Sequence, residues 1–163
     1  MATYQTTYSE SPVKGFPGQI ANEEKHNQIS RTPVNNLAFG APAFRVAGAG
    51  NDHKCTATPG TGFLGIAVLT PAVGVTLGSA FIDGYPANAD GGPSATAALM
   101  TDGQIFVTAG EAVAPGDDVY WITATSRYGT TAGAGATLIP GAIFDTTGAD
   151  GDIVEVSLKH RSA

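Results

Sequence analysis

The chain has 163 residues, of which 22 are glycine, 10 are proline and 13% are charged. This length suits one globular domain, and such frequent glycine and proline argue against long helices. The net charge is −6 and the eight basic residues are scattered. Because neutralising phosphates requires clustered lysine and arginine, we expect neither nucleic acid nor an anionic membrane as a partner.

The single cysteine, Cys55, rules out an internal disulfide and is compatible with a reducing compartment. The opening residues lack the basic and apolar regions of a signal peptide. No apolar stretch approaches the roughly 18 residues of a membrane span. We therefore expect a protein that is made and assembled in a cytoplasm.

Residues 1–39 are polar and show no sustained apolar period. Within Gln19–Thr32 the only apolar residues are Ile20, Ala21 and Ile29, too few to hold a helix against a core. We predict an extended N-terminal arm over residues 1–39, followed by a β domain over residues 40–163. Sparse apolar anchors, together with main-chain hydrogen bonds, would allow such an arm to dock on a partner.

From Gly40 onward the pattern predicts about eight short strands, and hence an all-β fold, a small β-barrel or sandwich. The last strand, Ile153–Lys159, alternates cleanly between apolar and charged or polar residues. Pro140-Gly141 indicates a bulge in the strand before it. The expected strands cover residues 43–47, 63–69, 75–77, 81–82, 105–107, 119–122, 138–144 and 153–159.

The stretch Leu99–Ile122 is expected to form the middle of the core. It contains two apolar runs joined by a turn-rich connection, and it holds the only tryptophan of the chain. We interpret the runs as two core strands. The predicted core residues are Phe44, Phe63, Ile66, Phe106, Val119, Trp121 and Val156.

A faint internal similarity links two parts of the chain. Gly40–Val46 resembles Gly116–Ile122, and each is followed 25 residues after its first glycine by a glycine within an apolar run, Gly65 or Gly141. Two β-hairpin-like units packed about a pseudo-dyad would explain this. Chance recurrence of glycine and aromatic residues in a β protein would explain it equally well.

Motifs that could carry chemistry are weak. Asp52-His53-x-Cys55 offers metal-ligand types but no second ligand pair, and the acidic pairs near Asp117 and Asp150 lack the spacing of a calcium loop. The glycine-rich segments lack the Lys-Ser/Thr of a phosphate loop, and no Gly-x-Ser-x-Gly elbow is present. We predict no enzymatic activity, no cofactor and no metal site.

Several motifs taken in order resemble a known family. They are Gly15-Phe-Pro-Gly-Gln-Ile-Ala21, Gly40-x-Pro-Ala-Phe-Arg-Val46, Phe63-Leu-Gly-Ile-Ala67, Gly103-Gln-Ile-Phe-Val-Thr108 and Val113-Ala-Pro-Gly-Asp117. The pattern is similar to the structural cement, or head decoration, proteins of tailed bacteriophages. The resemblance covers most of the chain.

This resemblance implies a capsid protein on the outer surface of the virion. It would bind the major capsid protein, often as a homotrimer, and clamp neighbouring subunits against the pressure of packaged DNA. Members of the family differ in oligomeric state and in which terminus grips the shell. The candidate capsid-binding residues are Phe16, Pro17, Gln19, Ile20, Ile29 and Arg31.

Two alternatives belong to other functional classes. A carbohydrate- or receptor-binding β module would use Tyr85, Tyr128 and acidic loop residues around one concave site. A hydrolase would need a deep pocket with two opposed carboxylates.

Overall fold

The computed structural model describes residues 14–60, 62–70, 84–87 and 96–158. These residues form strands and connecting loops, with no helix among them, so none of the described segments is a helix that could span a membrane. The predicted all-β fold is confirmed. The strands are β1 (Ile20–Pro33), β2 (Leu37–Ala38), β3 (Pro42–Arg45), β4 (Lys54–Thr56), β5 (Phe63–Ala67), β6 (Gly84–Tyr85), β7 (Ala97–Thr108), β8 (Asp118–Ile122), β9 (Arg127–Gly129), β10 (Ala136–Phe144) and β11 (Ile153–Leu158).

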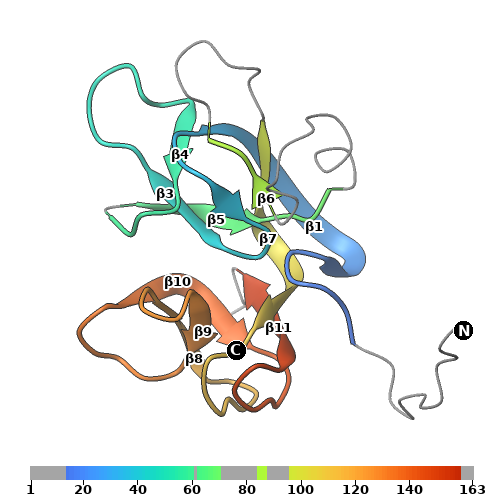
Figure 1. The fold of residues 1–163 in the computed structure, drawn as a ribbon. Coiled ribbons are helices and arrows are strands. Elements are labelled where there is room, and N and C mark those ends of the chain that lie inside the picture. The colour runs from blue at the N-terminus through green and yellow to red at the C-terminus, as the bar shows by residue number, and fades with distance from the viewer. Residues whose placement is uncertain (1–13, 61, 71–83, 88–95, 159–163) are drawn as a thin grey trace, which may run out of the picture.

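The strands are arranged in two lobes that share β7 (Figure 1). In the first lobe the pairing order is β1-β4-β3-β5-β7, and β7 also pairs with β1, so the circuit closes on itself. Closure leaves few unpaired strand edges, which in open sheets invite aggregation. Strands β2 and β6 form a separate two-stranded sheet.

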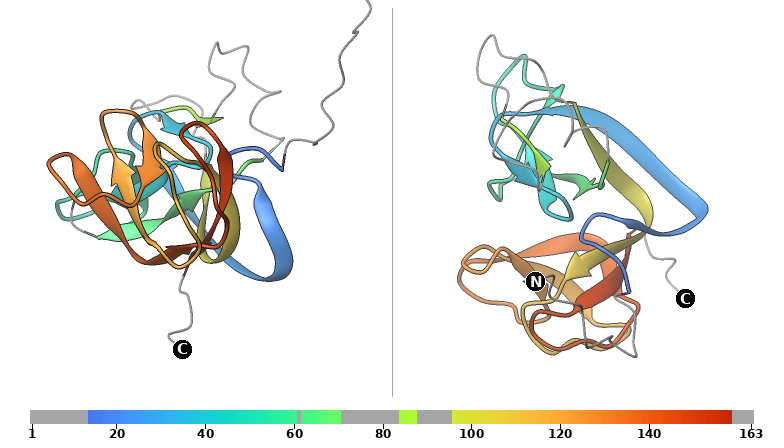
Figure 2. Two further views of the ribbon diagram at one scale, coloured as in Figure 1. Left: turned by 90° about the horizontal axis from the view of Figure 1, so that it is seen from below. Right: turned by 45° about the vertical axis from the view of Figure 1, so that its right-hand side comes forward.

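The second lobe is built in the same way from the other half of β7. Its order is β7-β11-β10-β8-β9, and a parallel bridge between Ala109 and Tyr128 returns from β9 to the end of β7. The amide of Gly110 donates to the carbonyl of Tyr128 at 2.7 Å. The right-hand view of Figure 2 shows the two lobes side by side.

The two lobes therefore repeat one five-strand unit. The first strand of each unit is parallel to the third and antiparallel to the last, and the units run in the same order along the chain. The sequence repeats with the same spacing. Gln28-Ile29 and Thr32 recur 76 residues later as Gln104-Ile105 and Thr108. Gly40 and Gly65 recur at the same separation as Gly116 and Gly141.

The β-hairpin-like units predicted from the glycine similarity are present. The segment after Gly40 pairs with the run around Gly65, and the segment after Gly116 pairs with the run around Gly141. A register shift accompanies each glycine, and the second is the bulge predicted at Pro140-Gly141.

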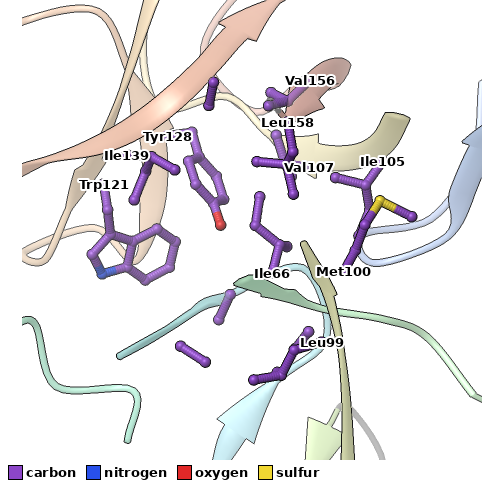
Figure 3. Close-up of a cluster of buried hydrophobic side chains, with 14 of the residues drawn as sticks. Ile66, Leu99, Met100, Ile105, Val107, Trp121, Tyr128, Ile139, Val156 and Leu158 are labelled. Carbon is purple, nitrogen blue, oxygen red and sulfur yellow. The ribbon is translucent and has the colours of Figure 1, made fainter. Parts of the chain in front are cut away.

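A single buried cluster of apolar side chains extends through both lobes (Figure 3). Phe44, Ile66, Val119, Trp121 and Val156 are buried, as predicted. Phe63 is partly buried and packs against the cluster.

Phe106 was predicted to lie in the core, but it does not. Ile105 and Val107 point inward and are fully buried, so alternation turns Phe106 to the opposite face, where it is half-buried. Its ring covers Gly15: a Cβ added at Gly15 would lie 2.6 Å from the Cδ2 atom of Phe106.

The described part of the predicted arm, residues 14–39, is extended over β1 and pairs with strands of the chain's own β domain. Strand β1 pairs with β7 along both lobes and with β4 at Thr32 and Pro33. Its apolar content is low because only Ile20 and Ile29 pack against the core, while most of its other side chains are exposed. Main-chain pairing, which needs no apolar pattern, holds it in place.

The two central apolar runs are both strands, as predicted. They belong to β7 and β8, which do not pair with each other: β8 pairs with β9 and β10. The expected strands at 43–47, 63–69, 138–144 and 153–159 correspond to β3, β5, β10 and β11. Those at 75–77 and 81–82 lie outside the described residues.

Candidate protein-binding surface at the N-terminal turn

The segment before β1 forms a tight turn at Phe16–Gln19. Proline at the second position and glycine at the third, with φ +82°, are the residues that a type II turn requires. The amide of Gln19 donates to the carbonyl of Phe16 at 3.0 Å, and the amide of Phe16 donates to Oε1 of Gln19 at 3.1 Å.

Three main-chain hydrogen bonds, formed with Phe106 and Leu69, fix this turn to the fold. Gly18 N–H donates to the carbonyl of Phe106 at 2.8 Å, and Gly18 accepts from the amide of Leu69 at 2.7 Å. Phe106 N–H in turn donates to the carbonyl of Gln19 at 2.9 Å. A Cβ at Gly18 would lie 2.8 Å from the carbonyl oxygen of Ala67, so only glycine fits there.

The side chain of Phe16 is 64% exposed on this fixed turn. A phenylalanine in water forgoes roughly 1.5–3 kcal/mol of burial free energy. The turn therefore presents an apolar anchor whose backbone is already ordered, which lowers the entropy cost of binding a partner.

The remaining candidate residues are divided between the turn and β1. Gln19 is exposed and Pro17 is half-buried. Ile20 and Ile29 pack against the core of the chain itself, so they support the fold more than they offer a docking face. Arg31, near the end of β1, is half-buried and lies away from Phe16 in the other lobe.

Strand β1 also presents an edge of backbone. It pairs with β7 on one side and meets β4 on the other side only at Thr32 and Pro33. Three extra residues between Asn22 and Asn27 bulge outward opposite Gln104 and Asp102. Such an edge can accept an extended segment from a partner protein.

A groove of about 320 Å³ lies beside the turn, between the lobes. Pro17, Phe39 and Trp121 supply apolar surface, and Asn35 and Asn36 supply amides. None of the described charged side chains lines this interlobe groove. Sequence reasoning missed the groove because its walls come from segments far apart in the chain.

The two tyrosines that the carbohydrate-binding alternative would use are buried, whereas that alternative requires exposed rings. Tyr85 and Tyr128 are 0% and 1% exposed. Their hydroxyls donate to the carbonyls of Val68 and Gly40, each at 2.7 Å. Burial raises the pKa of both phenols. They are core residues with a satisfied polar end.

The Asp52-His53-x-Cys55 segment does not form a site in the described residues. Cys55 is fully buried. Burial raises the pKa of its thiol to about 11, against the lowering effect of Arg31. Within the described ranges no three His, Cys, Asp or Glu side chains are grouped so as to hold a metal ion.

Comparison with known proteins gives a consistent result. A family model described as "Structural cement protein (E217 gp24/Pam3 gp6)" matches residues 4–159. The fold is similar to that of a chain in the structure titled "The capsid of Myoviridae Phage XM1". That match has a TM-score of 0.68 at 17% identity and covers 96% of this chain and 98% of the other. A search of curated proteins found no match.

Proposed function

Since the chain belongs to the structural cement protein family, we propose that it binds the outer surface of a phage head and clamps adjacent major capsid proteins. The observation that carries the proposal is the exposed Phe16 ring on a turn fixed by hydrogen bonds. Aromatic anchors in preorganised positions are typical of the residues that dominate protein–protein binding energy.

The fold suits a mechanical role. Two closed lobes with one continuous core form a body that resists shear, because most of its strands are paired on both edges and cannot be pulled out without breaking both sets of pairs. A body of this kind, held at the Phe16 turn and along the β1 edge, would transmit load between two shell subunits. The result would be a head that withstands a higher pressure of packaged DNA.

A binding experiment with a matched control tests this. Undecorated heads are mixed with wild-type protein, Phe16→Ala or Leu138→Ala, and bound protein is measured after sedimentation. Leu138 is also exposed, at 48%, but lies on β10 in the second lobe. We expect Phe16→Ala to weaken binding by about tenfold or more, as for an interface hot spot, and Leu138→Ala to leave it near the wild-type value.

The stability of Phe16→Ala should match that of the wild type, because the ring is exposed. Equal head binding by Phe16→Ala and wild type would contradict the role of the turn. The clamping step has its own readout: decorated heads should survive osmotic shock at a higher frequency than undecorated ones. Equal survival would contradict it.

A further inference from the structure

A second concave surface lies between the lobes, and its volume is about 510 Å³. Ile29, Phe63, Leu64 and Leu158 give it an apolar wall. Two cationic side chains, Arg31 from β1 and Arg45 from β3, also line it. We refer to this site as the arginine pocket.

The two arginines reach the same pocket because of the strand order. Strand β4 lies between β1 and β3, with Pro33 and Arg45 both paired to Cys55. Arg45 packs across Gly62, where a Cβ would lie 2.9 Å from its Cδ atom. Glycine at this position leaves room for the arginine stem.

Among the described residues, neither guanidinium forms an ion pair with an acidic side chain. Nη1 of Arg31 donates to the carbonyl of Ser30 at 2.8 Å, and its Nε is buried with no hydrogen-bond partner in the part of the chain that the structure describes. Over the described residues, the ion pair that forms is Arg127–Asp150, outside this pocket. No Asp or Glu side chain within residues 14–60, 62–70, 84–87 and 96–158 lines the pocket.

This arrangement is costly for the chain in isolation. Two like charges at one concave surface repel each other, and a buried N–H donor without a partner loses its hydration. The chain carries only eight lysines and arginines and a net charge of −6. Two of the eight nevertheless share a pocket in which no described residue supplies a carboxylate, and an anionic group would balance their charge.

We propose that the arginine pocket receives a carboxylate side chain, Asp or Glu, flanked by apolar residues, from a subunit of the shell. This rests on the function proposed above. Guanidinium groups bind carboxylates through paired hydrogen bonds. A free inorganic anion would use the arginines but not the apolar wall formed by Phe63 and Leu158, whereas an acidic protein segment would use both. Arginine within apolar surroundings is also characteristic of the centres of protein interfaces.

The test compares charge-matched variants on undecorated heads at low and high NaCl. The double variant Arg31→Gln/Arg45→Gln should bind about tenfold or more weakly, with a weaker dependence on salt. The double control Arg127→Gln/Lys54→Gln makes the same change in net charge outside the pocket and should bind within about twofold of the wild type. Arg45→Gln alone provides a variant at an exposed side chain, so that a folding defect at half-buried Arg31 cannot obscure the result.

The outcomes separate this inference from the proposed function. If the wild type itself fails to bind heads, the proposed function is wrong. If the wild type binds and the double variant binds equally well, only the arginine pocket is wrong. Sedimentation of the free protein adds a third outcome: if the wild type self-associates and the double variant is monomeric, the pocket binds a second copy and the proposal is overturned.

Discussion

Tyr128 joins the two lobes through one side chain. It lies on β9 in the second lobe, and its hydroxyl donates to the carbonyl of Gly40 in the first lobe at 2.7 Å. Its ring packs edge-to-face on Trp121, with centroids 4.9 Å apart. The residue thus contributes both core packing and a buried hydrogen bond.

Tyr128→Phe should keep the packing and leave the Gly40 carbonyl without this donor. We expect the free energy of unfolding to fall by about 1–3 kcal/mol, the cost of an unsatisfied buried polar group. Chemical denaturation followed by tryptophan fluorescence measures this change. Tyr120→Phe is the control, because Tyr120 is only half-buried, and a loss of equal size in the control would contradict the assignment.

The ionisation of two glutamates, Glu111 and Glu155, should affect the stability of the fold in opposite directions. Burial raises the pKa of Glu111, but hydrogen bonds from the amides and hydroxyls of Thr131 and Thr130 together lower it by more, so the net shift is downward. Burial, and then the charge of Asp145, raise the pKa of Glu155. Glu111 therefore stabilises the fold when ionised, and Glu155 destabilises it when ionised.

The stability of single variants against pH tests these signs. Glu111→Gln should be less stable than the wild type by about 1 kcal/mol at neutral pH, and the difference should shrink as the pH falls below about 4.5, where the unfolded chain's glutamate takes up a proton. Glu155→Gln should be at least as stable as the wild type at neutral pH. That advantage should disappear as the pH falls through the raised pKa toward 4.5. Parallel stability curves for wild type and variant would contradict either assignment.

At the scale of elements, β7 depends on a glycine at its midpoint. Gly103 lies between the half of β7 that pairs with β5 and the half that pairs with β11, and it has φ +122°. A Cβ there would lie 2.9 Å from the Cβ of His26 and 3.0 Å from the carbonyl oxygen of Lys25, in the bulge of β1. The glycine lets two strands cross closely where the lobes meet.

Gly103→Ala should destabilise the protein by about 1–3 kcal/mol, because the backbone is strained and the β1 bulge must move. For a chain of this size that corresponds to a fall of about 2–12 °C in Tm. Gly133→Ala is the matched control: no atom lies within 4 Å of its Cβ position and its φ is not positive. A Tm for Gly103→Ala as high as that of the control would contradict the argument.

The strands that the sequence predicted are those whose side chains carry a pattern. Alternation identified β11, and apolar runs identified β5, β8 and β10, because these strands bury one or both faces. Strand β1 was missed because main-chain hydrogen bonds hold it to the fold and few of its side chains pack against the core. The short strands β4 and β9 contain three residues each, too few to show a period.

The candidate surface was predictable in part. Gly15-Phe16-Pro17-Gly18 signals a turn, and an apolar residue in a polar turn suggests a contact, so Phe16 could be selected from sequence. The presence of Arg31 and Arg45 in one pocket could not be predicted from the sequence, because it depends on β4 inserting between β1 and β3. The same holds for the burial of Tyr85 and Tyr128, which only the tertiary fold determines.

At the scale of the molecule, the repeated units do not form two independent domains. They share β7, and their apolar side chains form one cluster. Removing either unit would leave half of β7 without a strand partner on at least one edge and would expose side chains that the cluster buries in the other unit. Repeat units in contact through a large apolar interface unfold together when neither is stable alone.

We therefore expect one cooperative unfolding transition. The only tryptophan, Trp121, lies in β8, so its fluorescence reports on the second lobe, while calorimetry reports on the whole chain. The two midpoints should coincide, and the calorimetric and van't Hoff enthalpies should agree.

Tyr128→Phe should lower both midpoints by the same amount, because it weakens the contact between the lobes. A calorimetric trace with a second transition that fluorescence does not follow would show that the lobes unfold separately. In that case a rigid body could not carry load from one shell subunit to the next.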